Sequence, residues 1–127
     1  MGDIDNRDLV SSTSARVKLG IMYLNGQGTP TPNIQHAKHL FEQAASAAAL
    51  APQSSGEAYT QLGLLSTLEK CGQPDLHEAK RHFESAVQLN DLEAHVQLGK
   101  LLLEASEDVI PHDYRRALKL FAAAHAR

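Results

Sequence analysis

Apolar residues recur along this chain at steps of three and four positions, the spacing that places side chains on one face of an α-helix. Glycine and proline interrupt the pattern, for example in segments 26–32 and 71–74. We therefore predict six helices joined by short connections, an arrangement that makes successive helices antiparallel. Their approximate ranges are 14–25, 32–50, 57–69, 75–90, 91–105 and 113–126.

Polar residues mark the predicted helix ends. Asp75, Asp91 and Asp113 each precede an apolar periodic stretch, where a carboxylate accepts hydrogen bonds from the first turn of a helix. Asn90 is expected to end the fourth helix. The serine and threonine cluster at 11–14 offers several N-caps for the first helix.

Two segments are predicted to lie outside these helices. Residues 1–13 are polar and mixed, and we interpret them as a tail or as the remnant of a preceding helix. Residues 52–56, with the sequence Pro-Gln-Ser-Ser-Gly, are predicted to form a loop.

One short motif is repeated three times. Ala-x-x-x-Leu-Gly occurs at 15–20, 58–63 and 94–99, and Ala-x-x-x-Phe follows each copy after a variable interval. The pairs define three helix-turn-helix repeats, at about 14–50, 56–90 and 91–126. We therefore predict an all-α fold, an α-solenoid that forms one repeat domain over residues 14–127.

Glycine in the middle of a helix needs an explanation, because it is less favourable there than alanine by about 1 kcal/mol. We expect the missing Cβ to let the first helix of each pair approach the second closely. The alanines of the second motif would supply a matching small face, and the phenylalanines would fill the space beside it. The residues concerned are Gly20, Gly63 and Gly99, then Ala37, Ala79 and Ala117, then Phe41, Phe83 and Phe121.

The motif Ala-x3-Leu-Gly-x2-Tyr-x2-Gly-x-Gly at 15–28, continued by Ala-x2-Leu-Phe-x2-Ala-Ala at 37–45, resembles a Sel1-like repeat. Segment 110–117, Ile-Pro-His-Asp-Tyr-x2-Ala, resembles the second half of that repeat. Successive motif glycines are 43 and 36 residues apart, unlike the fixed unit of about 34 in tetratricopeptide repeats. The later repeats lack the Gly-x-Gly turn. The resemblance spans residues 14–126 and implies a tetratricopeptide-like solenoid that binds other proteins.

Composition narrows the choice of partner and compartment. A net charge of −3 without a basic stripe argues against nucleic acid. No run of about 18 apolar residues is present, so we predict no direct membrane insertion. Cys71 is the single cysteine and cannot form an internal disulfide, which favours the cytoplasm or another reducing intracellular compartment.

The sequence offers little catalytic or metal-binding chemistry. His36 and His39 lie three residues apart but lack a third ligand nearby, so we interpret them as solvent-facing. His77 and His82 resemble a zinc-protease pair with one residue too many, which turns the second ring about 140° away from the first. Cys71 is interpreted as a surface thiol. We therefore predict no catalytic site, no metal site, no cofactor and no enzymatic activity.

The predicted function is that of an adaptor or scaffold without catalysis. The first helix of each pair lines the concave side of such a solenoid, and offsets from each Leu-Gly pair select the concave positions. They are Val17, Ile21, Leu24, Thr60, Leu64, Thr67, Val96, Lys100 and Leu103. Six of the nine are apolar, which suits a protein or peptide partner presenting an amphipathic helix or an extended apolar segment.

In an alternative interpretation, the protein itself covers the same apolar stripe. Residues 1–13 or a second copy of the chain would cover it, so a homodimer is possible. The chain would then be a self-associating or regulatory structural domain of a larger protein.

The end of the sixth helix raises a related question. It lacks a polar capping helix, and we expect Leu118 and Leu120 to be partly exposed. Three explanations are open: the chain is a fragment, this end forms a dimer contact, or a partner covers it.

Overall fold

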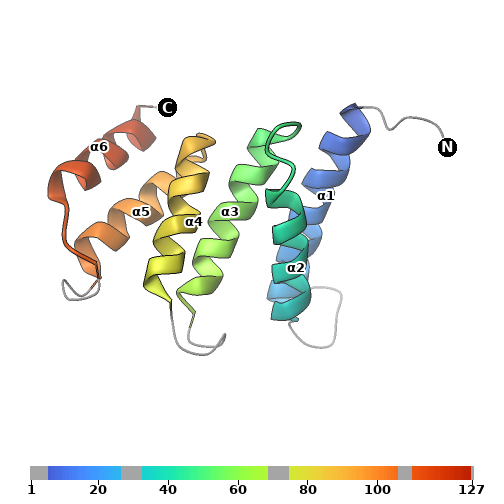
Figure 1. Ribbon diagram of the computed structural model, residues 1–127, viewed down its shortest axis with the longest axis horizontal. Coiled ribbons are helices and arrows are strands. Elements are labelled where there is room, and N and C mark those ends of the chain that lie inside the picture. Colours follow the sequence, from blue (N-terminus) through green and yellow to red (C-terminus); the bar gives the residue numbers. More distant parts are fainter. Residues whose placement is uncertain (1–5, 27–32, 69–74, 106–109, 127) are drawn as a thin grey trace.

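The computed structural model describes residues 6–26, 33–68, 75–105 and 110–126. Within these residues the secondary structure is entirely α-helical (Figure 1). The helices are α1 (Asn6–Asn25), α2 (Ile34–Ala45), α3 (Pro52–Ser66), α4 (Leu76–Gln88), α5 (Leu92–Glu104) and α6 (Tyr114–His125).

The six helices form two layers. In the inner layer, α1 contacts α3 and α3 contacts α5. The outer helices α2, α4 and α6 each pack on the inner helix that precedes them, and α2 and α4 also pack on the inner helix that follows. In Figure 1, α2 and α4 are nearer to the viewer, while α1 and α6 stand at opposite ends of the row. The predicted all-α solenoid of three helix pairs is confirmed.

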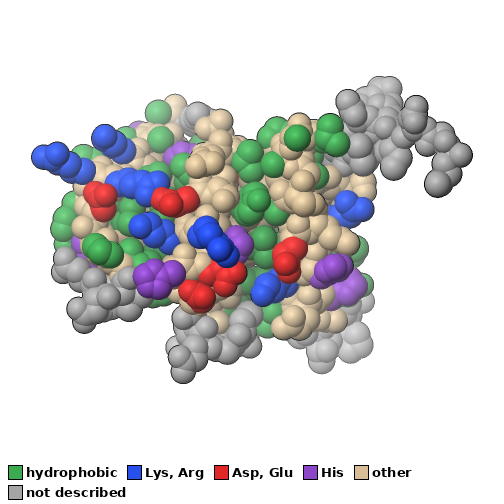
Figure 2. All heavy atoms as spheres, viewed as in Figure 1, with side chains coloured by type: hydrophobic (Ala, Val, Ile, Leu, Met, Phe, Trp, Pro, Cys, Tyr) green, Lys and Arg blue, Asp and Glu red, His purple; other side chains and the backbone are tan. Residues whose placement is uncertain are grey.

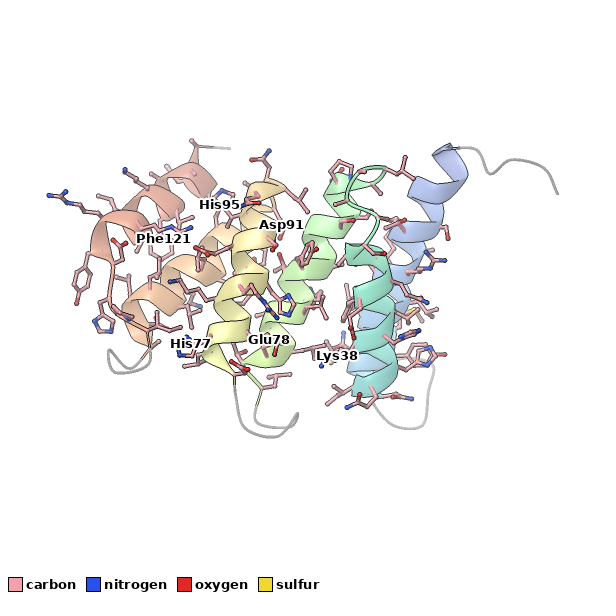
Figure 3. The ribbon with its side chains drawn as sticks, viewed as in Figure 1. Lys38, His77, Glu78, Asp91, His95 and Phe121 are labelled. Atoms are coloured by element: carbon pink, nitrogen blue, oxygen red, sulfur yellow. The ribbon has the colours of Figure 1, made fainter. Side chains whose placement is uncertain are left out.

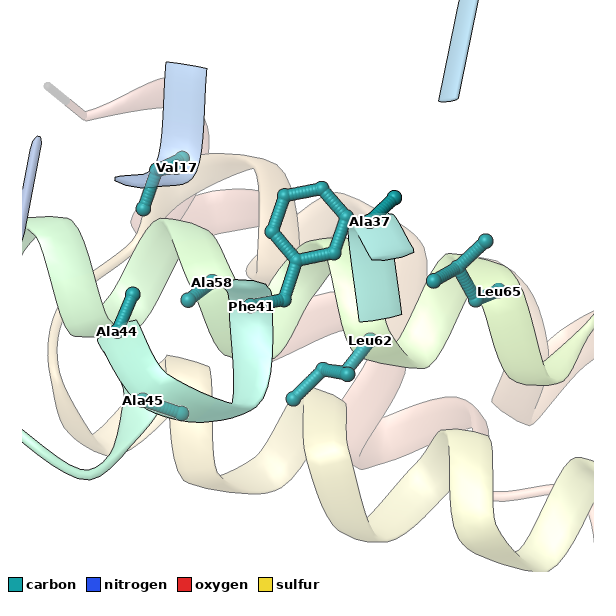
Figure 4. Close-up of a cluster of buried hydrophobic side chains, with 8 residues drawn as sticks. All are labelled: Val17, Ala37, Phe41, Ala44, Ala45, Ala58, Leu62 and Leu65. Atoms are coloured by element: carbon teal, nitrogen blue, oxygen red, sulfur yellow. The ribbon is translucent and has the colours of Figure 1, made fainter. Parts of the chain in front are cut away.

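Most of the buried apolar residues in the described segments fall into two hydrophobic clusters, each joining adjacent repeats. The first surrounds Phe41 and draws side chains from α1, α2 and α3 (Figure 4). The second surrounds Phe83 and Leu98 and joins α4 to α5 and α6. Because these clusters cross repeat boundaries, each repeat depends on its neighbour for burial of its apolar face.

Aspartates cap three helices, as predicted. The carboxylates of Asp75, Asp91 and Asp113 accept hydrogen bonds from backbone N–H groups three residues later, at 2.9, 3.3 and 3.0 Å. Asn90 has a φ of 63°, a left-handed conformation that asparagine tolerates, and it follows the end of α4. This compact turn lets α5 begin at once after α4.

Two helix starts differ from the prediction. α1 begins at Asn6 rather than near Ser14, so residues 6–13 are its first turns and not a tail. Thr13 is buried one turn before Val17, which is also buried. The packed face of α1 therefore extends toward its N-terminus.

The second difference is α3, which begins at Pro52 and includes the segment predicted to be a loop. Proline is well suited to the first helical position, where its missing N–H loses no hydrogen bond. Ser55 is fully buried, and its hydroxyl donates to the carbonyl oxygen of Ala44 at 2.6 Å, which ties this first turn to α2.

The three motif glycines lie against phenylalanine rings. A Cβ built on Gly20, Gly63 or Gly99 would come within 2.7, 2.5 or 2.8 Å of the ring of Phe41, Phe83 or Phe121, respectively. Such distances leave no room for a methyl group. The alanines of the second motif, Ala37, Ala79 and Ala117, are all buried.

Candidate binding surface

The inner layer presents one row of side chains to solvent, on the side of α1, α3 and α5 that faces away from the outer helices. We call these residues the inner row. Its members are Lys18 and Ile21 of α1, Glu57, Gln61, Leu64 and Leu68 in and just after α3, and Glu93, Gln97, Lys100 and Glu104 of α5. All are exposed or half-buried.

Two of the nine predicted concave residues do not belong to any surface. Val17 and Thr60 are each only 1% exposed. Both lie three residues before the motif glycine, whereas the solvent-facing position lies two residues before it. One residue rotates a helical position by about 100°, enough to turn it into the core.

The other predicted residues keep some solvent contact. Lys100 is exposed, and Ile21, Leu24, Leu64, Thr67, Val96 and Leu103 are half-buried. Ile21 and Leu24 also pack against the first core cluster, while Leu64 and Leu103 pack against the second.

The inner row is more polar than the predicted stripe. Its apolar members are Ile21, Leu64 and Leu68, and the remaining members are charged or amide side chains. The sequence-based selection missed Lys18, Gln61 and Gln97, which occupy the same position two residues before each glycine. Alignment of the three repeats would have found them.

Thr60 has a structural role at the boundary between repeats. Its hydroxyl donates to the carboxylate of Asp91 and also lies 3.0 Å from the carbonyl oxygen of Gly56. Asp91 also caps α5, and the ring of His95 contacts its carbonyl oxygen at 2.8 Å (Figure 3). This arrangement fastens α3 to the start of α5.

Charges on the inner row influence one another across helices. Burial raises the pKa of Glu57, the nearby carboxylate of Asp91 raises it further, and Lys18 of α1 opposes both effects. Within α5, the amide of Gln97 donates to the carboxylate of Glu93 at 2.7 Å. The surface therefore combines paired polar groups with exposed apolar side chains.

A hollow of about 290 Å³ lies at the border of the second and third repeats. Thr67 at the end of α3, Leu76 and Phe83 of α4, and Gln97 and Lys100 of α5 line it. The structure thus brings together Thr67 and Lys100, which the sequence had placed on one surface. The hollow combines apolar walls with the lysine of α5.

The outer helices α2, α4 and α6 form a second surface. Charged and histidine side chains gather over α4 and the adjoining parts of α2 and α6 (Figure 2). A second hollow, of about 250 Å³, is lined by Lys38 of α2, by Asp75, Glu78 and His82, and by residues of α3; Figure 3 labels Lys38 and Glu78 on its two sides.

His82 is half-buried in that outer hollow. Burial lowers its pKa below 6.5, although a contact of 3.4 Å to the Glu78 carboxylate acts in the opposite direction. The equivalent positions of the other two repeats are the buried leucines Leu40 and Leu120. A titratable ring has therefore replaced an apolar side chain in the second repeat. The expectation that Leu120 is partly exposed is wrong, because this residue belongs to the second core cluster.

The two histidine pairs noted in the sequence lie on α2 and α4. His36 and His39 are exposed, and the ring centroid of His36 lies 4.2 Å from that of Tyr23. His77 is also exposed. Across the four described segments, no three His, Cys, Asp or Glu side chains are arranged to hold a metal ion. Cys71 lies outside the described residues.

Among the described helices, none has the length and apolar character needed to cross a bilayer. The geometry defines an all-α protein of helix-turn-helix repeats whose inner layer is open to solvent.

The Sel1 repeat family model matches the chain three times, at residues 13–48, 56–91 and 92–124. The chain belongs to the Sel1 repeat family, in agreement with the resemblance seen in its motifs. Repeats of this family are generally protein-interaction modules and are typically non-catalytic. Comparison with curated proteins gives no match.

Proposed function

We propose that this chain is a non-catalytic adaptor or scaffold module that binds a segment of a partner protein on the inner row. The observation that carries the proposal is the open inner layer, in which three adjacent helices expose apolar and charged side chains together. The family's general role in protein interaction supports the same function.

The distribution of side chains suits an amphipathic partner. Ile21, Leu64 and Leu68 lie in the C-terminal halves of α1 and α3 or just beyond, whereas α5 contributes Lys100 and Glu104 at the corresponding level. A helix or extended segment lying across the three helices would meet an apolar region first and charged groups next. The lone Cys71 suits a reducing compartment such as the cytoplasm.

The rival interpretation, in which residues 1–13 fill the surface, receives no support from the described part of that segment. Residues 6–13 continue α1 along its own axis, which keeps their backbone in the inner layer. A second copy of the chain on the inner row is the other form of this alternative.

The test places a photo-activated cross-linking residue at Gln61 on the inner row and, in a matched variant, at Glu42 of α2. Glu42 is exposed and lies on an outer helix. In extract of the source cells, we expect a protein to be cross-linked from position 61 and not from position 42. Cross-linking from 61 to a second copy would favour self-association, and equal cross-linking from both positions would contradict the inner row as the binding surface.

The captured protein is then purified and its affinity measured against variants. Leu68→Glu should weaken binding roughly tenfold or more, because an exposed apolar contact becomes a charge. Leu50→Glu is the matched control, since Leu50 is similarly exposed but lies after α2. The double variant Ile21→Glu with Leu64→Glu should abolish binding, with helical content measured alongside because both residues also touch the core. Unchanged affinity in both tests would overturn the proposal.

A further inference from the structure

Each end helix exposes apolar side chains whose counterparts in the other repeats are more deeply buried or are charged. Leu19 and Met22 of α1 are each 42% exposed, whereas their counterparts in the second repeat, Leu62 and Leu65, are 4% and 3% exposed. Leu98, the counterpart of Leu19 in the third repeat, is fully buried. The difference has a simple cause: α2 covers this face of α3, and α4 covers this face of α5, but no described helix precedes α1.

At the opposite end, α6 exposes the face that α2 and α4 direct toward the next inner helix. Phe41 and Phe83 are buried, but their counterpart Phe121 is half-buried. Tyr114 and Leu118 are 66% and 70% exposed. The counterparts of Tyr114, Ile34 and Leu76, pack instead against the two core clusters.

The sequence of α6 also differs from the sequences of α2 and α4 on this face. Leu118 and Ala122 occupy positions that hold Lys38 and Glu42 in α2, and Lys80 and Glu84 in α4. A helix face that stays in water is expected to carry polar side chains. Here two charged positions have become apolar, which indicates that this face contacts protein.

We propose that the exposed face of α6 in one copy of the chain binds the exposed face of α1 in a second copy, so that the solenoid continues from one molecule into the next. The two faces are the halves of a contact that the chain already forms twice, between α2 and α3 and between α4 and α5. Leu19 of the second copy would take the place that Leu62 and Leu98 occupy within the chain.

A polar contact supports the same pairing. The hydroxyl of Ser55 donates to the carbonyl oxygen of Ala44 at the first boundary between repeats. Ser12 holds the equivalent position in α1 and is exposed, and Ala124 is the counterpart of Ala44 in α6. Such head-to-tail pairing is heterologous, and it builds rings or open arrays rather than a closed two-fold dimer.

Sedimentation velocity over micromolar to millimolar loadings tests the proposal. The unmodified chain should sediment faster as its concentration rises. Leu19→Glu and Leu118→Glu should each lower the association constant roughly tenfold or more, while the control Leu50→Glu, at similar exposure but away from both ends, should leave it unchanged. Far-ultraviolet circular dichroism and urea midpoints verify that each variant is folded.

The decisive experiment mixes the two variants Leu19→Glu and Leu118→Glu. Leu19→Glu keeps an intact α6 face and Leu118→Glu keeps an intact α1 face, so an equimolar mixture should form a dimer that grows no further. A chain that stays monomeric at every loading, because other partners or further repeats cover its ends, would overturn the proposal. Association that survives in Leu118→Glu alone or in Leu19→Glu alone would indicate a contact between like faces and would also overturn it.

Discussion

Gly63 and Phe83 fit together so closely that a Cβ on the glycine would lie 2.5 Å from the Cε1 atom of the ring. The same relationship joins Gly20 to Phe41 and Gly99 to Phe121. In each repeat, the inner helix has no side chain at the glycine, and the phenylalanine ring of the outer helix packs against the backbone there. The loss of helix propensity at glycine is thus offset by burial of an aromatic side chain.

Replacing Gly63 by alanine should therefore destabilise the protein, even though alanine is the better helix former. We expect the free energy of unfolding to fall by about 1–2 kcal/mol, since overpacking against buried Phe83 exceeds the gain in propensity. Urea denaturation measures the change. Gly99→Ala is the comparison: Phe121 is half-buried at the end of the solenoid and can move, so the loss there should be smaller. Equal losses would contradict this account.

Thr60→Val should lower the free energy of unfolding by about 1–2 kcal/mol, because the hydroxyl that donates to Asp91 is lost. Valine is the residue at the same position of the other two repeats, Val17 and Val96, so its shape is tolerated in this fold. A double-mutant cycle with Asp91→Ala measures the coupling between the two side chains. Additive effects would show that the hydrogen bond contributes nothing to the attachment of α5.

Ser55→Ala should cost about 1 kcal/mol of stability or more, because the carbonyl oxygen of Ala44 loses the hydroxyl that donates to it in a buried position. Ser12→Ala is the matched control at the equivalent position of the first repeat, where the side chain is exposed. Thermal unfolding of both variants at low protein concentration makes the comparison. A similar loss in the two variants would argue against the role assigned to Ser55.

His82 should make the stability of the protein depend on pH. Because burial lowers its pKa below 6.5 in the native state, the unfolded chain binds more protons as the pH falls below 6.5. The contribution of the neutral ring is therefore present above pH 6.5 and is lost as the pH falls toward the lower native pKa. His82→Leu, which restores the residue type of Leu40 and Leu120, should remove this part of the pH dependence and stabilise the protein most at acidic pH.

Urea midpoints between neutral and acidic pH, measured for the unmodified chain and for His82→Leu, provide the measurement. His39→Leu, which replaces an exposed histidine of α2, is the control for the loss of a histidine at the surface. Identical pH profiles for the unmodified chain and His82→Leu would refute the prediction.

Much of the fold follows from the sequence because its determinants are local. The three-and-four spacing of apolar residues, the aspartates at 75, 91 and 113 and the repeated Leu-Gly and Ala-x-x-x-Phe motifs predict six helices and their pairing. The prediction is wrong at two helix starts, where tertiary contacts decide the outcome. Thr13 and Ser55 look like polar end or loop residues, but both are buried in contacts with other parts of the chain, which lengthens α1 and α3.

The sequence by itself thus determined the helix-turn-helix unit, its three copies and the family to which they belong. Only the tertiary structure decided which equivalent positions are covered. Leu19 and Leu98 have the same motif around them, yet one is 42% exposed and the other fully buried. Burial in a solenoid depends on whether a neighbouring repeat lies against the position, and no pattern within one repeat contains that information.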